Sequence, residues 1–339
     1  MLHLRELWSR TKAFLARLFR RKPPEPGRFE TGGKGTFRGF LAVAPWILPQ
    51  RDYLVYVPKG HANGPNDREA PLIVLIHGCQ QTPEDIAAGT RIANTADDLG
   101  CLVLLPRQKN GANRWGCWNW YDGGTTRGWG ETAIVAAQIE EVRERYRIDR
   151  RRVFVAGMSS GGGLAAILGL RRPDLVAGTF IHSGIACGAA SSPYTALSVI
   201  SNGADTDVAE IGADARAAAD PTSLPVPLIA IQGSLDTAVP PINAVQLVRQ
   251  YLALNAHPAA TSGGATELPP PDHVATTTTD GRPVTTSEWN DGRRLVARHV
   301  LIDGLGHAWS GGDEQHPYHD AHGPDATALL GAFVRSALS

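Results

Sequence analysis

A run of β-forming residues that ends in a glycine-flanked serine places the strongest constraint on how this chain can fold. Residues 153–156 read Val-Phe-Val-Ala, Gly-Met-Ser-Ser-Gly follows at 157–161, and small and apolar residues then continue with helical spacing to Leu170. When a strand leads through a tight turn into a helix and serine lies at the turn, the turn strains the serine backbone. It also lifts the serine hydroxyl clear of the sheet edge. Gly157 and Gly161 suit a crossing where two backbones approach too closely for side chains. The pattern predicts a nucleophile at Ser159; the alternative is an ordinary loop rich in glycine and serine.

Strand and helix patterns alternate along the chain from about residue 53. Apolar runs predict strands at 53–57, 72–76, 102–105, 153–156, 178–182 and 228–231, and helical patterns cover 83–99, 133–146, 240–254 and 324–338. Residues 287–289 and 295–302, separated by Asn-Asp-Gly, predict a hairpin or paired strands. Residues 184–222 are small and Ala-rich, without a firm pattern. The alternation predicts an α/β fold with a mostly parallel, doubly wound sheet and helices on both faces.

Bulk composition narrows the class of protein. The 339 residues allow one large α/β domain with additions, and the formal net charge of zero gives no reason to expect nucleic-acid binding. Apolar stretches are too short for a membrane span. Four cysteines in a chain of this length predict neither a disulfide scaffold nor a zinc site, and Cys101 fits a buried strand.

The amino terminus departs from the neutral balance. Residues 1–22 carry seven basic side chains against Glu6, and their apolar residues recur at roughly helical spacing. Two interpretations stay open: a helix that packs on the domain or is solvated, and an amphipathic helix lying on an anionic membrane or a polymer granule. Residues 23–27, Pro-Pro-Glu-Pro-Gly, predict a linker. The expected organisation is residues 1–27 as helix and linker, then a catalytic domain at 28–339 with a surface excursion at 259–280. The missing secretory-signal pattern favours a cytoplasmic or peripheral location.

A nucleophilic serine needs a base to accept its proton and an acid to orient that base. Asp236 follows the buried strand at 228–231, and His307 lies in a glycine-flanked loop after the last strand pattern. The chain order serine, acid, histidine is that of the α/β-hydrolase fold. The alternatives are a turn aspartate and a loop histidine without a partner.

Attack by a serine on an acyl group forms a tetrahedral intermediate, whose negatively charged oxygen needs two backbone amide donors. We expect one from the amide of Ser160, at the start of the helix, and one from Cys79 in the loop after residues 72–76, with Gly78 as its neighbour. His316, His319 and His322 form a short His-rich stretch that fits a polar surface loop better than a metal site. We expect no metal and no cofactor.

Six motifs together resemble the poly(3-hydroxybutyrate) depolymerase family of α/β-hydrolase esterases, which is related to feruloyl and acetylxylan esterases. The matching pieces run in order from about residue 50 to the end: His77-Gly-Cys-Gln-Gln81, Cys117-Trp-Asn-Trp120, Gly157-Met-Ser-Ser-Gly-Gly162, His182-Ser-Gly184, Gly233-Ser-Leu-Asp236 and Gly306-His-Ala-Trp-Ser-Gly-Gly312. The resemblance implies a triad of Ser159, Asp236 and His307. It also implies hydrolysis of hydroxyalkanoate esters or their polymer through an acyl-enzyme, with feruloyl or acetylxylan esters as the alternative substrates. Many members of that family are extracellular. The basic N-terminal helix and the 259–280 excursion of this chain are not part of the family's motif pattern.

Several residues beside these motifs are candidates for substrate binding. They are His77, Gly78, Trp118, Trp120, His182 and Trp309, because indoles give large, rigid contact area to an apolar ester. The alternative for the tryptophans is packing beneath the loops, and for His182 an ordinary strand end. A non-catalytic binding protein with the same fold is the alternative of a different class.

Cys79 and Cys117 both lie in loops expected at the catalytic edge, so they are candidates to face each other. They would form a disulfide in an oxidising compartment and be free thiols in a cytosol. Both states stay open from the sequence.

Overall fold

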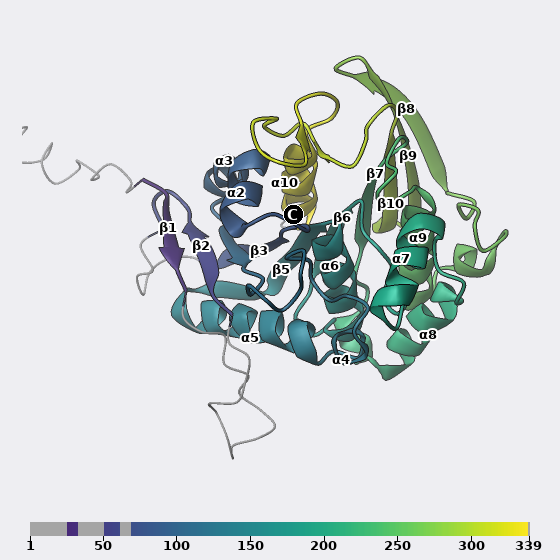
Figure 1. Ribbon diagram of the computed structural model, residues 1–339, viewed down its shortest axis with the longest axis horizontal. Coiled ribbons are helices and arrows are strands. Elements are labelled where there is room, and N and C mark those ends of the chain that lie inside the picture. Colours follow the sequence, from purple (N-terminus) through teal and green to yellow (C-terminus); the bar gives the residue numbers. More distant parts are fainter. Residues whose placement is uncertain (1–25, 33–50, 62–68, 338–339) are drawn as a thin grey trace, which may run out of the picture.

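A ten-stranded sheet forms the centre of the computed structural model, which describes residues 26–32, 51–61 and 69–337 (Figure 1). The strand order is β1-β2-β4-β3-β5-β6-β7-β10-β9-β8. The parallel strands are β4 (Leu102–Pro106), β3 (Ala70–Ile76), β5 (Ile148–Met158), β6 (Gly178–His182), β7 (Leu228–Gly233) and β10 (Arg294–Ile302). Antiparallel strands flank them: β1 (Arg28–Thr31) and β2 (Tyr53–Val57) on one side, β9 (Arg282–Asp291) and β8 (His273–Thr279) on the other.

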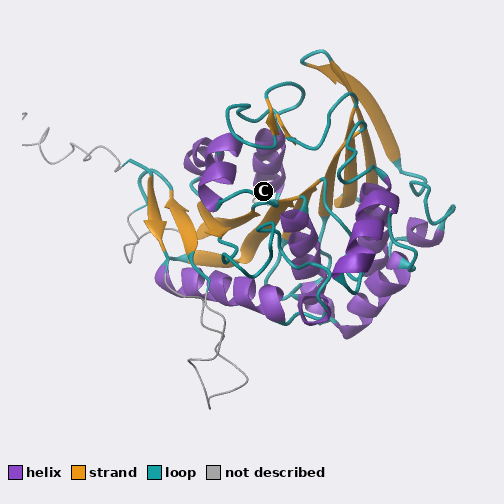
Figure 2. Ribbon diagram, viewed as in Figure 1, coloured by secondary structure: helices purple, strands orange, loops and turns teal. Residues whose placement is uncertain are grey.

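Helices cover both faces of the sheet, as the alternation predicts (Figure 2). On β3, Leu72, Val74 and Ile76 pack into one apolar cluster while Ile73 and Leu75 pack into the other, so the strand is apolar throughout. The first cluster lies beneath α5 (Gly130–Arg145), α6 (Ser160–Arg171), α7 (Pro193–Asn202), α8 (Val208–Ala218) and α9 (Ile242–Leu254). The second lies beneath α2 (Pro83–Thr90), α3 (Ile92–Leu99) and α10 (Ala326–Ser336).

Two segments differ from the sequence-based prediction. The single helix expected at 83–99 is two helices, because Arg91 has the left-handed backbone conformation (φ 54°) that ends α2 before α3 begins. Residues 184–222, which show no firm pattern, form α7, α8 and a 3-10 turn at Pro221–Ser223. Ser192 caps α7 and Asp207 caps α8, so cap residues mark both starts although their helices are built of small residues.

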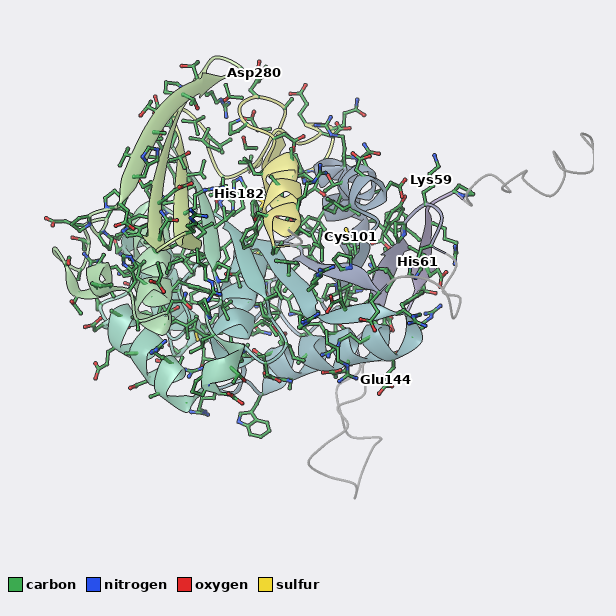
Figure 3. The ribbon with its side chains drawn as sticks, turned by 180° about the vertical axis from the view of Figure 1, so that it is seen from behind. Lys59, His61, Cys101, Glu144, His182 and Asp280 are labelled. Carbon is green, nitrogen blue, oxygen red and sulfur yellow. A yellow bond between two sulfur atoms is a disulfide. The ribbon has the colours of Figure 1, made fainter. Side chains whose placement is uncertain are left out.

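The expected 259–280 excursion is ordered by one side chain and extends the sheet. Arg249 on α9 donates to the carbonyl oxygens of Ala260, Ser262, Gly264 and Glu267, which fixes the stretch after the 3-10 turn at Pro258–Thr261. Strand β8 then forms an exposed edge, and Asp280 lies at the tip of the β8–β9 hairpin (Figure 3). The excursion therefore consists of a 3-10 turn, an irregular stretch held by Arg249, and the first strand of a surface hairpin.

The basic N-terminal helix lies outside the described residues, as does most of its linker. Among the helices that the structure describes, none has the length and apolar character needed to cross a membrane. The predicted catalytic domain starts within the described part at β1, which pairs with β2 and so belongs to the sheet.

Candidate active site

Ser159 lies at the tight turn between β5 and α6, where the sequence predicts a strained serine. Its backbone has φ 56° and ψ −123°, and its amide donates to the carbonyl oxygen of His182 on the neighbouring strand (3.0 Å). A Cβ atom on Gly157 would lie 2.4 Å from the Gly161 carbonyl oxygen, and one on Gly161 would lie 2.3 Å from the Ile76 carbonyl oxygen. Only glycine fits at either position, so these two residues allow the helix to begin directly against the strand ends.

Asp236 and His307 meet at the same edge of the sheet. Asp236 follows β7, its side chain is fully buried, and its Oδ2 accepts a hydrogen bond from His307 Nδ1 (2.8 Å). Its Oδ1 accepts from the amides of Ala238 (3.0 Å) and Val239 (2.8 Å). Burial alone would raise the pKa of Asp236, but the bond and charge of His307 and the Val239 amide outweigh it, and the pKa lies below its ordinary value. Asp236 is thus held as a carboxylate against the imidazole.

The bond to Asp236 fixes the tautomer of His307. With its proton on Nδ1, the neutral ring presents a lone pair on Nε2, as a general base requires. The His307 side chain is 16% exposed, and the ring of Tyr318 meets it edge-on at 6.2 Å between centroids. Asp303, the nearest alternative acid in the sequence, is exposed and accepts from Ser234 Oγ instead (2.8 Å).

The loop after β3 runs directly against Ser159. A Cβ atom on Gly78 would lie 3.4 Å from the Cβ of Ser159. The Gly78 amide donates to Gln81 Oε1 (2.9 Å), whereas the Cys79 amide has no acceptor among the hydrogen bonds recorded for the described residues. Ser160 is the first residue of α6, so its amide is one of those without an intrahelical acceptor. Both predicted oxyanion donors therefore have amides without a hydrogen-bond acceptor among the described residues, and Ser160 directly follows Ser159.

A disulfide joins this loop to the tryptophan-rich loop, because Cys79 and Cys117 are bonded with their Cα atoms 4.1 Å apart. The prediction that the two cysteines face each other is confirmed. Ser160 Oγ accepts from the Trp118 amide (3.3 Å) and lies 3.4 Å from Cys79 Sγ. A disulfide sulfur carries no proton, so the serine hydroxyl is the donor in that contact. The side chain of Ser160 thereby ties the nucleophile turn to both loops.

A buried carboxylate, Glu131 on α5, holds the tryptophan-rich loop from below. Its Oε2 accepts from the Asn119 amide and its Oε1 from Gln108 Nε2, each at 2.6 Å. Gln108 also donates to the Cys117 carbonyl (2.8 Å), and its amide donates to His77 Nε2 (3.2 Å). Glu131 has no signal in the sequence, because it precedes the helical pattern expected at 133–146 and belongs to none of the motifs.

The residues proposed for substrate contact are mostly interior, which corrects that expectation. Trp118 and Trp309 are fully buried and Trp120 is 3% exposed; the indole of Trp118 donates to the His77 carbonyl (3.0 Å), and that of Trp309 to Thr327 Oγ1 (3.0 Å). Of the two interpretations of these tryptophans, packing beneath the loops accounts for their positions. His77 and His182 are also buried, and burial lowers the pKa of His77 to about 4 and that of His182 to about 3. Of this set, Gly78 lies against the Ser159 side chain and His182 accepts the Ser159 amide through its backbone carbonyl.

Three other apolar side chains are exposed on the loops that carry the site, and we call them the apolar rim: Trp115, Leu235 and Tyr318. Trp115 is 58% exposed and its carbonyl oxygen accepts from the Gln80 amide in the oxyanion loop. Leu235 immediately precedes Asp236 and is 64% exposed, and the Tyr318 hydroxyl donates to Gln80 Oε1 (2.9 Å). Exposed apolar positions in loops carry no periodic pattern, which is why the sequence gives no sign of them.

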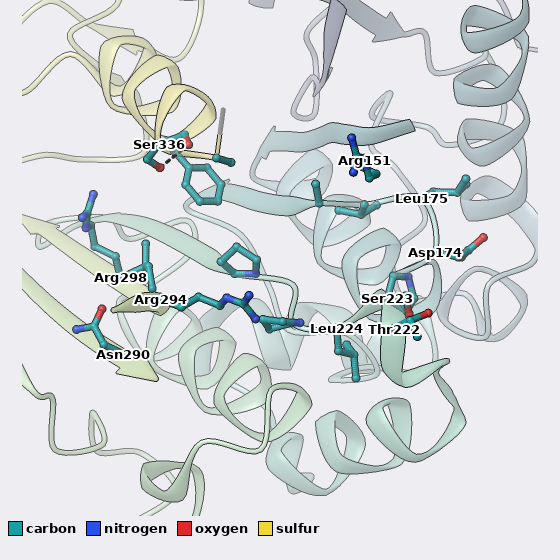
Figure 4. Close-up of a pocket in the computed structure, with 18 of the residues that line it drawn as sticks. Arg151, Asp174, Leu175, Thr222, Ser223, Leu224, Asn290, Arg294, Arg298 and Ser336 are labelled. Atoms are coloured by element: carbon teal, nitrogen blue, oxygen red, sulfur yellow. Dashed lines mark hydrogen bonds between the residues drawn. The ribbon is translucent and has the colours of Figure 1, made fainter. Parts of the chain in front are cut away.

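The remaining candidates are the histidines of the His-rich stretch at 316–322. Among the described residues no group of three or more His, Cys, Asp or Glu could hold a metal; His319 Nδ1 contacts the Pro317 carbonyl, and His322 pairs with Asp280. A cavity of about 1180 Å³ opens at the amino ends of the strands, with Arg151, Arg294 and Arg298 among its lining residues (Figure 4). It contains none of the motif residues.

Comparison with known proteins places the chain in a family. Residues 51–267, more than half of the chain, match the family described as esterase PHB depolymerase. The chain is 33% identical over 186 residues to poly(3-hydroxyalkanoate) depolymerase C of Paucimonas lemoignei (54% of this chain, 44% of that one). It is 32% identical over 143 residues to feruloyl esterase B of Neurospora crassa (40% and 46%). The chain thus spans less than half the length of these relatives.

A solved structure supports the fold. The acetyl xylan esterase from Aspergillus awamori superposes with a TM-score of 0.63 at 20% identity, covering 83% of this chain and 94% of that one. This likeness and the sheet topology show an α/β-hydrolase fold. With its fold and the family match in agreement, the chain belongs to the esterase PHB depolymerase family.

Proposed function

We propose that this protein is a serine carboxylic ester hydrolase in which Ser159, Asp236 and His307 act as the catalytic triad. The observation that carries the proposal is the pairing of His307 with a buried Asp236 at the sheet edge where Ser159 is held in a strained turn. Strain at an exposed turn persists only where the surrounding structure enforces it, and such strain gathers at functional sites.

In the proposed acylation step, Ser159 Oγ attacks the ester carbonyl carbon while His307 Nε2 accepts the hydroxyl proton. The carbonyl π electrons move onto oxygen, and the amides of Cys79 and Ser160 stabilise that oxyanion. Asp236 holds the imidazolium by its Nδ1–H bond. When the tetrahedral intermediate collapses, the C–O bond to the alcohol breaks and the imidazolium returns its proton to the leaving oxygen.

In deacylation, water replaces the alcohol. His307 Nε2 accepts a proton from water as the water oxygen bonds to the acyl carbon; collapse then breaks the bond to Ser159 Oγ, which takes the proton back from the imidazolium. The products are a carboxylic acid and the regenerated serine. Every proton in the two proposed steps passes through His307, so their proton balance closes without a cofactor.

For the substrate, we propose short-chain hydroxyalkanoate esters or a polyester of the poly(3-hydroxybutyrate) type. The apolar rim supports this class, because exposed indole, isobutyl and phenol groups on the loops that carry the proposed triad favour contact with an apolar chain. The names of the relatives point to both polyhydroxyalkanoates and feruloyl or acetylxylan esters. A feruloyl or acetylxylan ester is therefore the second candidate.

The first test is hydrolysis of a chromogenic short-chain ester by the full chain and by Ser159→Ala. We expect turnover in the full chain and a fall to background in the variant, because no other group supplies the nucleophile. Ser336→Ala, an exposed serine on α10, is the matched control and should keep full activity. A non-catalytic binding protein would show equal background rates in all three.

A substrate panel then separates the two ester classes. Hydroxybutyrate oligomers, methyl ferulate and acetylated xylan are compared by kcat/KM at one pH. Our proposal expects the oligomers to give the highest value, and Trp115→Ala and Leu235→Ala to raise KM for them with little change in kcat. A preference for ferulate or acetylxylan that these variants leave unchanged would favour the second candidate.

A further inference from the structure

The end of β6 holds two buried polar residues that the proposed triad does not use. His182 is the last residue of the strand and is fully buried, and Ser183 follows it in a left-handed backbone conformation (φ 49°) with 1% exposure (Figure 3). The Ser183 amide donates to the Ile231 carbonyl (2.9 Å), which fixes the serine between β6 and β7. Its side chain is thereby set beside Asp236.

Two hydrogen bonds lead through the interior from the loop after His307 to Ser183: the Ser310 amide donates to His182 Nε2 (3.2 Å), and His182 Nδ1 contacts Ser183 Oγ (3.2 Å). The Ser183 side chain in turn interacts with the Asp236 carboxylate and lowers its pKa. Asp236 also accepts from His307 Nδ1. This series of interactions therefore links the loop after His307 back to the triad acid through the interior.

The donor and acceptor roles in this series of hydrogen bonds follow from the Ser310 amide, with which it begins. A backbone amide can only donate, so His182 Nε2 is the acceptor and the ring carries its proton on Nδ1. That proton is donated to Ser183 Oγ, which leaves the hydroxyl proton of Ser183 free to point to the Asp236 carboxylate. Because His182 is buried and stacked on Trp309, it stays neutral and the direction does not change over the working pH range.

We propose that Ser183 is a positioning residue of the triad, donating to Asp236 in a direction that the Ser310 amide sets through His182. The inference rests on the proposed function. A donor on Asp236 anchors the carboxylate in the rotamer that faces His307. It also withdraws negative charge from the oxygen atoms, so that Asp236 is a weaker proton acceptor for His307.

The test compares Ser183→Ala with the unaltered protein on a soluble chromogenic ester. Loss of a hydrogen bond to a charged group changes a rate or equilibrium constant roughly 10- to 100-fold. We therefore expect kcat/KM to fall by that factor, mainly through kcat. Without the donor, Asp236 binds the imidazolium of His307 more strongly, so the acidic limb of the pH profile should move to higher pH. The titratable groups beside His307 and Asp236 are His182 and the Tyr318 phenol, and His319 lies near His182; all three are retained in the variant.

Two variants at His182 test the direction of this series of hydrogen bonds. His182→Asn keeps a side-chain N–H near the Nδ1 position, whereas His182→Leu removes both the donor and the acceptor. We expect Asn to preserve most of the activity and Leu to lower kcat with the same shift in the pH profile as Ser183→Ala, though smaller. Ser287→Ala, a buried serine on β9, is the matched control, and far-UV circular dichroism and a melting curve verify folding of each variant.

The outcomes separate this inference from the proposed function. If Ser159→Ala is inactive while Ser183→Ala keeps the normal rate and pH profile, Ser183 has no positioning role. A lower rate in Ser183→Ala with an unmoved acidic limb would make Ser183 a packing residue only. Retention of activity in Ser159→Ala would overturn the proposed function itself.

Discussion

At the scale of single residues, this site depends on buried groups whose protonation is fixed by their neighbours. Asp236 accepts two backbone amides in addition to His307, and His77 accepts the Gln108 amide while its Nδ1 donates to the Gly78 carbonyl (2.7 Å). Each of these bonds removes a choice of tautomer or rotamer. The active arrangement is therefore built before substrate arrives, which is the condition for electrostatic stabilisation without reorganisation.

Asp236→Asn should reduce kcat by about 10⁴-fold while the protein stays folded, because an amide in place of the carboxylate favours the wrong imidazole tautomer. The matched control is Asp303→Asn, whose carboxylate bonds to Ser234 instead of His307. Initial rates on a soluble ester provide the measurement. Near-normal rates in Asp236→Asn together with a large loss in Asp303→Asn would transfer the role to Asp303.

Three buried histidines make stability depend on pH. Burial is the first cause that lowers the pKa of His77 to about 4, of His182 to about 3 and of His299 to about 4, so all three are neutral in the folded protein near pH 6. The unfolded chain takes up their protons below its ordinary pKa near 6.5, so stability falls as pH drops from about 6.5 towards 4. Each contributes a slope of roughly 1.4 kcal/mol per pH unit within that window.

Urea unfolding at pH 7 and pH 5 measures this dependence, and His299→Leu isolates one contribution. His299 Nε2 has no partner among the described residues, and the residue lies outside the proposed triad. The variant should lose less stability between pH 7 and pH 5 than the unaltered protein. An equal loss in both proteins would show that His299 is protonated in the folded state.

At the scale of elements, the loops after the six parallel strands carry the residues of this site, and the disulfide connects two of these loops. Cys79 and Cys117 are 38 residues apart, and closing a loop of that length reduces the entropy of the unfolded chain. Cys117→Ser should therefore lower the free energy of unfolding by about 3 to 4 kcal/mol. The double variant with Cys79→Ser should be no less stable than the single one, as equilibrium denaturation would reveal; an additive loss would point to packing of the separate thiols.

The sequence predicts the elements of this fold far better than the contacts between them. Strands such as residues 178–182 and the turn at Ser159 follow from local pattern alone, and the order of Ser159, Asp236 and His307 follows from the strands that they terminate. Contacts made across the sheet leave no local trace: Ser183 meets Asp236, and Glu131 meets Asn119, only because separate strands and helices bring them together. Likewise, burial of Trp118 and Trp309 depends on which loops close over them.

At the scale of the whole molecule, the basic N-terminal stretch is a segment for which the proposed ester hydrolysis gives no role. Gly27 packs against Tyr56, where a Cβ atom would lie 1.9 Å from the phenol oxygen, so a truncation that spares the sheet ends at residue 25. Removing residues 1–25 should leave turnover of a soluble ester unchanged. Binding to anionic vesicles or polyester granules should weaken, and the difference should shrink at high salt.

Cosedimentation with vesicles of defined anionic lipid content, and with granules, provides the measurement. Equal binding by the full and shortened proteins would contradict a tethering role. Loss of soluble-ester activity on truncation would instead assign residues 1–25 to the folded domain.

The position of β10 in the sheet has a consequence for how small a working version of this protein can be. The segment that matches the family ends at residue 267, whereas β10 lies against β7 and leads to His307. A protein reduced to residues 51–267 would keep Ser159 and Asp236 but lose the base and leave Leu228–Gly233 as an unpaired edge. Such a fragment should be inactive and prone to aggregate, and adding the missing segment as a separate peptide should restore turnover only if strand pairing re-forms. The minimal catalytic unit is therefore larger than residues 51–267, the segment that matches the family.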